Sequence, residues 1–364
     1  MKDELHLEEN VNKEEEEKKE KKKPFILLLK RGKHGKRMLL LVLLLLVTGL
    51  MLGTSTYAWF TANKTVNVNN IQVNVAAQNG IQISVDGTSW KSIVQTDDIK
   101  GAINKYAAAV NMVPGAIEPV STVGEVDENG RMKMYYGTVD TNTAGDYILT
   151  ATKTEETSLD ESGKFVVFDL FFKVDADTPV YMTSSSGVTP KDTASDKGIK
   201  NASRIGFVVL GNTAAGSTLD AIQGLNAGTS ASSYIWEPNY DIHTAAAVTH
   251  AKDTYNITTT ETNADIIGYS GIKTDITKEN NIKVGDATEA LNSTYFGTVT
   301  PTYKTINGFT EQFSFLTLKS GITKIRVYMW VEGQDVDCEN SASGGNITYG
   351  LQITTENTTQ VTGD

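Results

Sequence analysis

Four acidic residues within eight positions near the end of the chain, in the segment EGQDVDCE, are the first candidates for chemistry: Glu332, Asp335, Asp337 and Glu339. Carboxylate oxygens at this density are ligands that Ca²⁺ prefers, so Glu332, Asp335 and Asp337 are candidate metal ligands, with Asp241 as a further one. The spacing does not follow the EF-hand loop. A solvated acidic strand end is therefore the alternative that the sequence favours, and we expect no other cofactor.

Catalytic chemistry has less support in the sequence. His243 and His250 do not form the HExxH pattern of a zinc protease, and we find no GxSxG elbow, phosphate-binding loop or dinucleotide fingerprint. Cys338 is the only cysteine, which rules out an intrachain disulfide. It has no recognisable Cys/His context, so a packed or partly exposed structural residue is favoured over a nucleophile. We expect a non-enzymatic protein with no catalytic residue.

Some residues whose side chains could bind a ligand lie in segments that are expected to be buried. Asp169 lies in KFVVFDLFFKV (164–174), whose two apolar faces predict a central strand buried on both sides. There it is either a satisfied buried polar group, which we favour, or a ligand. The tryptophans could either pack inside the protein or stack on carbohydrate, and packing is favoured. They are Trp59, Trp90, Trp236 and Trp330.

Alternating apolar residues predict the strands that must position these side chains. The first strand region, 61–75, alternates with a phase slip at Asn69-Asn70, which is typical of a β-bulge. Its apolar residues are Val66, Val68, Ile71, Val73 and Val75. We expect one short helix over 96–111, capped by Thr96 or Asp97, as the exception to the β pattern.

The last third of the chain has the clearest alternation. In TKIRVYMWVEG we expect Ile325, Val327, Met329 and Val331 to point inward, and Lys324, Arg326, Tyr328 and Glu332 to point outward. The segment 338–346 is expected to join this strand to NITYGLQITT as a hairpin loop. Many short strands with Gly, Asn and Asp turns predict a mainly β protein, an antiparallel sandwich over 61–364 with loop insertions.

Charge is distributed unevenly along the 364 residues, whose net charge is −11. Residues 1–37 hold 12 Lys/Arg and 9 Asp/Glu, a net of +3, so the remainder has a net charge of −14. An acidic main body argues against nucleic acid as a partner, because phosphate binding needs a basic surface.

The amino-terminal part predicts targeting to a membrane. Residues 1–37 are a charged, disordered head that ends in KRGKHGKR, and 38–60 is a 23-residue stretch without a charge. The basic flank predicts a cytoplasmic amino terminus. The stretch is long enough for a transmembrane anchor, but it also fits a signal peptide cut by a signal peptidase between Ala58 and Trp59. Both alternatives stay open.

The segment GTSTYAWFTANKTVNVNNIQVNVAAQNGIQISV (53–85) resembles the start of the TasA/camelysin class of exported Gram-positive proteins, which carry a SipW-type signal peptide. GAIEPVST (115–122) and the stretch 324–353 look like segments of uncharacterised Firmicutes surface proteins. The resemblance implies a jelly-roll-like sandwich, a location on the cell surface, and a role in fibres or biofilm matrix. The long charged head departs from a simple signal peptide and favours an uncleaved anchor.

Two functions are therefore expected. The first is a structural protein, a matrix fibre subunit that forms a homo-polymer when residues 61–75 pair as a donor strand with the open edge of a neighbour. Alternatively, residues 61–75 form an ordinary first strand in a sheet of their own molecule. The second function is a membrane-anchored extracellular binding module for glycan or protein, with Ca²⁺ at 332–339.

Overall fold

The computed structural model describes residues 72–78, 80–141, 147–156, 163–190, 198–249, 270–280, 292–305, 312–338 and 346–357. All of them belong to one compact unit, Thr56–Asp364. Within these ranges no helix has both the length and the apolar character needed to cross a bilayer. The predicted head at 1–37, the span at 38–60 and the cleavage residues Ala58 and Trp59 lie outside them.

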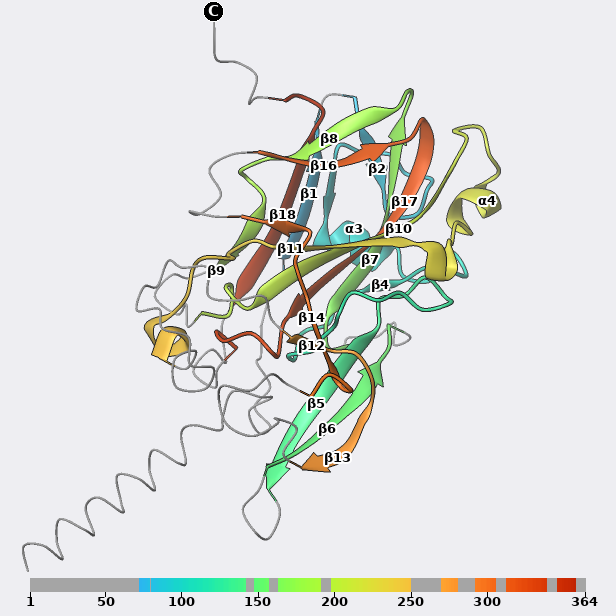
Figure 1. Ribbon diagram of the computed structural model, residues 1–364. Coiled ribbons are helices and arrows are strands. Elements are labelled where there is room, and N and C mark those ends of the chain that lie inside the picture. The colour runs from blue at the N-terminus through green and yellow to red at the C-terminus, as the bar shows by residue number, and fades with distance from the viewer. Residues whose placement is uncertain are drawn as a thin grey trace, which may run out of the picture. The chain divides into compact units, whose positions relative to one another are not determined.

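The protein is mainly β, and its first sheet brings the two ends of the described chain together (Figure 1). Its strands are β1 (Gln72–Ala77), β3 (Ile93–Gln95), β8 (Thr178–Met182), β9 (Gly187–Pro190), β16 (Phe313–Leu318) and β18 (Ile347–Thr354). The order is β16-β8-β18-β1-β3, with β9 also beside β18. β1 runs parallel to β18, so the expectation of a purely antiparallel sandwich is wrong at this pair.

The second sheet contains the longest strands. They are β2 (Gln82–Ser84), β4 (Asn111–Met112), β7 (Val166–Val174), β10 (Ser203–Thr213), β11 (Ser232–Glu237), β15 (Tyr303–Lys304) and β17 (Gly321–Val331). The order is β15-β11-β10-β17-β7-β2, with β4 beside β7. β17 therefore lies at the centre, antiparallel to both β10 and β7.

The main hydrophobic core lies between the two sheets, which gives the protein its sandwich character. Its members include Val75 and Tyr349 from the first sheet and Phe168 and Val327 from the second. Ile325, Val327, Met329 and Val331 of β17 face this core, as predicted.

The expectation that the other face of β17 points to solvent is wrong, because every residue of the strand is buried. Apolar side chains from outside the sheet cover this face, among them Val120, Met132 and Phe165. Period-2 alternation reports which residues share a face, but it does not report what covers that face.

The described residues also form two smaller sheets. β5 (Met134–Thr141), β6 (Tyr147–Thr154) and β13 (Ile276–Asn280) form one, and β12 (Ser270–Ile272) pairs with β14 (Phe296–Thr298) in the other. A separate apolar cluster joins them through Leu149, Ile272 and Phe296.

The described residues contain few helices, and all are short: α3 (Thr96–Gly101), α4 (Leu219–Gln223), the 3₁₀ turn η3 (Gly228–Ser230) and a helical segment at 245–249. α3 is shorter than the predicted helix over 96–111, because Asn104 adopts a left-handed φ of 61° soon after it ends. Its cap also differs from the prediction, since the Asp98 carboxylate accepts a hydrogen bond from the Gln95 N–H at 3.0 Å.

The predicted hairpin between the last two strands is also wrong. β17 belongs to the second sheet and β18 to the first, so the chain crosses from one sheet to the other between them. The alternation within each strand was predicted correctly. However, strands that follow each other in a sequence do not always pair with each other.

Candidate functional site

The carboxylates predicted as a metal site follow β17 directly and are buried. The exposed fraction is 0% for Glu332, 7% for Asp335 and 1% for Asp337. The favoured alternative, a solvated acidic strand end, is therefore wrong. The segment is held inside the protein by backbone bonds that Glu332 N–H donates to Ala202 (2.7 Å) and Gly333 N–H donates to Val120 (2.9 Å).

Each of these carboxylates accepts hydrogen bonds from within the protein. Asp337 accepts from the Thr244 N–H at 2.8 Å and lies 2.7 Å from His243 Nδ1. Glu332 accepts from the Trp330 indole N–H at 3.1 Å, and Asp335 forms an ion pair with Arg204.

In the part of the chain that the structure describes, no three His, Cys, Asp or Glu side chains are grouped so that they could hold a metal ion. Glu339 lies outside that part, and Asp241 is buried. Calcium at 332–339 stays a prediction.

Arg204, at the start of β10, organises this carboxylate cluster. Its guanidinium pairs with both Asp335 and Glu237, the latter at 2.5 Å, and is 1% exposed. Burial raises the pKa of Glu237 to about 8 against the opposing effect of Arg204. Burial likewise raises the pKa of Glu332 to about 7. At both glutamates the effect of burial on the pKa therefore outweighs that of the nearby Arg204.

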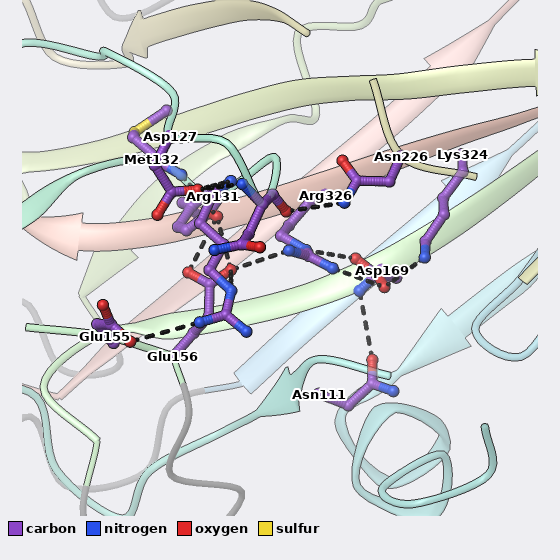
Figure 2. A network of polar contacts seen from close by, with 12 residues as sticks. Asn111, Asp127, Arg131, Met132, Glu155, Glu156, Asp169, Asn226, Lys324 and Arg326 are labelled. Atoms are coloured by element: carbon purple, nitrogen blue, oxygen red, sulfur yellow. Dashed lines mark hydrogen bonds and ion pairs between the residues drawn. The ribbon is translucent and has the colours of Figure 1, made fainter. Parts of the chain in front are cut away.

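A second ionic cluster lies on the covered face of β17, where Asp169 is the central acceptor (Figure 2). Arg326 Nε donates to one carboxylate oxygen at 2.7 Å, and the other oxygen lies 3.2 Å from Lys324 Nζ and accepts from the Tyr106 hydroxyl at 2.9 Å. Burial alone would raise the pKa of Asp169, but Arg326 and Lys324 hold it below its usual value. As predicted, Asp169 is a satisfied buried polar group.

Glu156 extends this cluster to the chain segment that follows β6 (Figure 2). Its carboxylate accepts from Arg326 Nη1 at 2.9 Å and from the Tyr328 hydroxyl at 3.0 Å, and lies 3.7 Å from Arg131 Nε. Burial raises its pKa to about 7, although Arg326 opposes the shift. The Tyr328 hydroxyl also accepts from the Met132 N–H at 3.0 Å. The cluster therefore fastens the segment around 131–156 to the central strand.

The sequence did not identify Glu156, Arg204 or Glu237 as members of these clusters. Their partners are far away in sequence, and neither spacing nor residue type indicated the pairings. One signal was available: Asp169, Lys324 and Arg326 interrupt two strongly apolar strands with opposite charges, and buried charges need a partner.

The environments of Cys338 and His243 indicate structural roles. Burial, together with the nearby charges of Asp335 and Glu332, raises the pKa of the Cys338 thiol far above its usual range, which is the reverse of what a thiolate nucleophile needs. His243 is paired with the buried Asp337, and His250 lies outside the described residues.

The predicted self-assembly strand is described in part. Val73 and Val75 lie in β1 with 0% exposure, between β18 and β3, whereas Val66, Val68 and Ile71 lie outside the described residues. Trp236 and Trp330 pack in the core, also at 0% exposure, and Trp90 is half-buried. Trp59 lies outside the described residues.

Comparisons with protein-family models, with curated proteins and with solved structures found no match for this chain. The two clusters are internal, hydrogen-bonded ion pairs that cross-link strands and loops. Satisfied networks of this kind hold the segments that they join in fixed positions.

Proposed function

We propose that this chain is a non-enzymatic structural protein of a Gram-positive cell surface or matrix, built on a jelly-roll-like sandwich. It assembles into a fibre when the first strand region, 61–75, of one copy pairs with a neighbour. The observation that supports the proposal best is the position of β1 in the first sheet.

β1 occupies a slot in the interior of the sheet. It pairs in parallel with β18 along its whole length of six residues, and antiparallel with β3 on the other side. Because a parallel pair needs no tight turn between its strands, the slot accepts an extended segment wherever that segment comes from. In the described part of its sheet, β3 pairs with β1 alone, so an occupied slot supports the position of β3.

The side chains of β1 make the slot specific. Val73 and Val75 enter the main core, where a neighbour's identical strand would place the same side chains. Exchange between identical chains therefore conserves every contact and changes only which copy supplies the strand. Repeated head to tail, such a contact does not close and produces a fibre.

Two features of the sequence support the location. The basic segment 30–37 followed by the uncharged 38–60 supports insertion into a membrane with the amino terminus inside. The acidic remainder, with a net charge of −14, supports solubility outside the cell. Cleavage near Ala58 releases the first strand region, whereas a retained anchor ties the sandwich to the membrane.

A mixing experiment tests strand exchange. Asn74 in β1 and Gln95 in β3 lie opposite each other and are both exposed. Chains carrying only Asn74→Cys, mixed with chains carrying only Gln95→Cys and oxidised, should give disulfide-linked pairs, because only exchange brings these positions of two copies together.

The matched control replaces the Gln95→Cys chain by one carrying Lys100→Cys, an exposed position on α3. Without exchange, both mixtures give the same low yield of linked pairs. That result, together with a monomeric mass at all concentrations, would leave the anchored binding module as the better function. The half-buried, stacked rings of Tyr234, Tyr303 and Phe313 offer that module a surface for sugar rings.

A further inference from the structure

We propose that residues 91–102 form a strap that controls when β1 can leave its slot, and that the Thr96 hydroxyl holds this strap closed. The role rests on the proposed exchange of β1 between copies, because it concerns the step that precedes exchange. The strap contains β3 and α3 and ends at the α3 C-cap, Ala102. It closes the side of the slot that faces away from β18.

Both ends of the strap are attached to the second sheet. At its start, Lys91 exchanges both backbone hydrogen bonds with Ile83 of β2, each at 2.8 Å. At its end, the Asn111 side chain in β4 donates to the Ala102 carbonyl at 3.3 Å. These attachments do not involve β1, so the part of the strap between them can separate from β1 while its ends keep their places.

The middle of the strap occupies one edge of β1. Val75 lies opposite Val94 in the antiparallel register, and the Ala77 N–H donates to the Ser92 carbonyl at 2.8 Å. Because backbone direction alternates along a strand, Val73, Val75 and Ala77 all direct their polar groups toward the strap. Release of β1 therefore requires these bonds to break first.

The Thr96 hydroxyl extends this ladder beyond the end of β3. In the same register Thr96 would pair with Val73, but the backbone of Thr96 already belongs to α3. Its side chain takes the place of the backbone groups. The hydroxyl accepts from the Val73 N–H at 2.8 Å and donates to the Val73 carbonyl at 3.4 Å. One side chain thus bonds both polar groups of Val73.

Burial of apolar side chains keeps the strap closed. The exposed fraction is 1% for Val94 and 0% for Ile99, and both belong to the main core. Opening transfers these side chains to water, which is unfavourable. In the open state β1 is bound only to β18, and a neighbour's β1 can then pair from the exposed edge and take its place.

Hydrogen exchange of the full-length chain, followed amide by amide, measures opening of the strap even in a single molecule. The Val75 N–H points to the strap and the Asn74 N–H to β18, so opening exposes the first amide and not the second. We expect lower protection at Val75 than at Asn74. Thr96→Val keeps the shape of the side chain without its hydroxyl. It should speed exchange at Val75 roughly tenfold, the scale of a hydrogen bond lost from a buried donor, and leave Asn74 almost unchanged.

Two control variants separate the hydroxyl from other effects of the substitution. Thr96→Ser keeps the hydroxyl and should keep the protection of Val75. Thr189→Val makes the same change at an exposed position of β9 in the same sheet and should also leave that protection unaltered. Equal protection of Val75 and Asn74 in the unaltered chain, or no response of Val75 to Thr96→Val, would overturn the proposal.

The cysteine mixture described for strand exchange then distinguishes the strap from the fibre. With Thr96→Val in both the Asn74→Cys and the Gln95→Cys chains, linked pairs should form roughly tenfold faster, because opening precedes exchange. An unchanged rate of linking would contradict the strap. Loss of protection at Val75 in the Thr96→Val chain without any linked pairs would support the strap and contradict exchange of β1 between copies.

Discussion

Asp169 illustrates, at the scale of a residue, how a charge is retained inside a strongly apolar strand. It is fully buried, and donors from Arg326, Lys324 and Tyr106 satisfy its carboxylate. The cost of removing such charges from water is offset only while every partner is present. The pairing therefore constrains which strands can be neighbours more than it adds to stability.

This view predicts a specific pattern of unfolding energies. Asp169→Leu removes the carboxylate shared by Arg326 and Lys324, which leaves Lys324 buried without this ion-pair partner, and should lower the free energy of unfolding by about 3–5 kcal/mol, as should Arg326→Met. The double variant should be less destabilised than the sum of the two, because both single variants lose the same Asp169–Arg326 interaction. Urea unfolding followed by tryptophan fluorescence measures all three.

The control is Lys319→Met, which removes the exposed ion pair with Asp177. Its unfolding midpoint should stay close to that of the unaltered chain, since solvent screens such pairs. Additive losses in the Asp169/Arg326 double variant would contradict the account of an obligatory buried pair.

At the scale of an element, the turn between β16 and β17 sets the position of the central strand. Gly321 has a left-handed φ of 105°, and a Cβ there would lie 2.2 Å from the carbonyl oxygen of Thr213. Both features require glycine, because side chains rarely adopt this φ and the backbone of β10 cannot give way.

Gly321→Ala should therefore lower stability by more than the roughly 1–3 kcal/mol that an unfavourable backbone conformation costs on its own. Gly216→Ala is the matched control, since a Cβ at Gly216 meets nothing within 4 Å. Thermal unfolding should show a clear fall in Tm for the first variant and little change for the second. A similar Tm for both would mean that the turn adapts to a side chain.

At the scale of the whole molecule, the two ionic clusters make stability depend on pH. Burial raises the pKa values of Glu156 and Glu332 to about 7 and of Glu237 to about 8. A carboxyl group whose pKa is raised by folding contributes stability below its unfolded value, and that contribution is lost as the pH rises through the folded value. Lowered pKa values, as at Asp169 and Asp127, act in the opposite sense at the acidic end.

We therefore expect the free energy of unfolding to be highest near pH 5 and to fall between pH 5 and pH 8. Urea titrations at pH 5, 6, 7 and 8 measure this. Glu156→Gln carries no titrating group at this position and should give a shallower slope over the same interval. A stability that rises from pH 5 to pH 8 would show that the carboxylates gain more from their cations than they lose by burial.

The sequence alone determined the local character of this protein. Alternation of apolar residues predicted a mainly β chain and the inward face of β17, and the apolar faces around Asp169 predicted its burial. Those properties depend on residues one or two positions apart, so a linear pattern records them.

Only the tertiary structure decided which strands and which charged side chains pair with each other. It placed β17 and β18 in different sheets, made β1 a parallel neighbour of β18, and covered the charged face of β17. It also turned the acidic segment after β17 inward onto Arg204, where the sequence favoured solvent. Each of these outcomes depends on which distant segments pack together, and that choice is made by burial and charge pairing across the whole chain rather than by spacing along it.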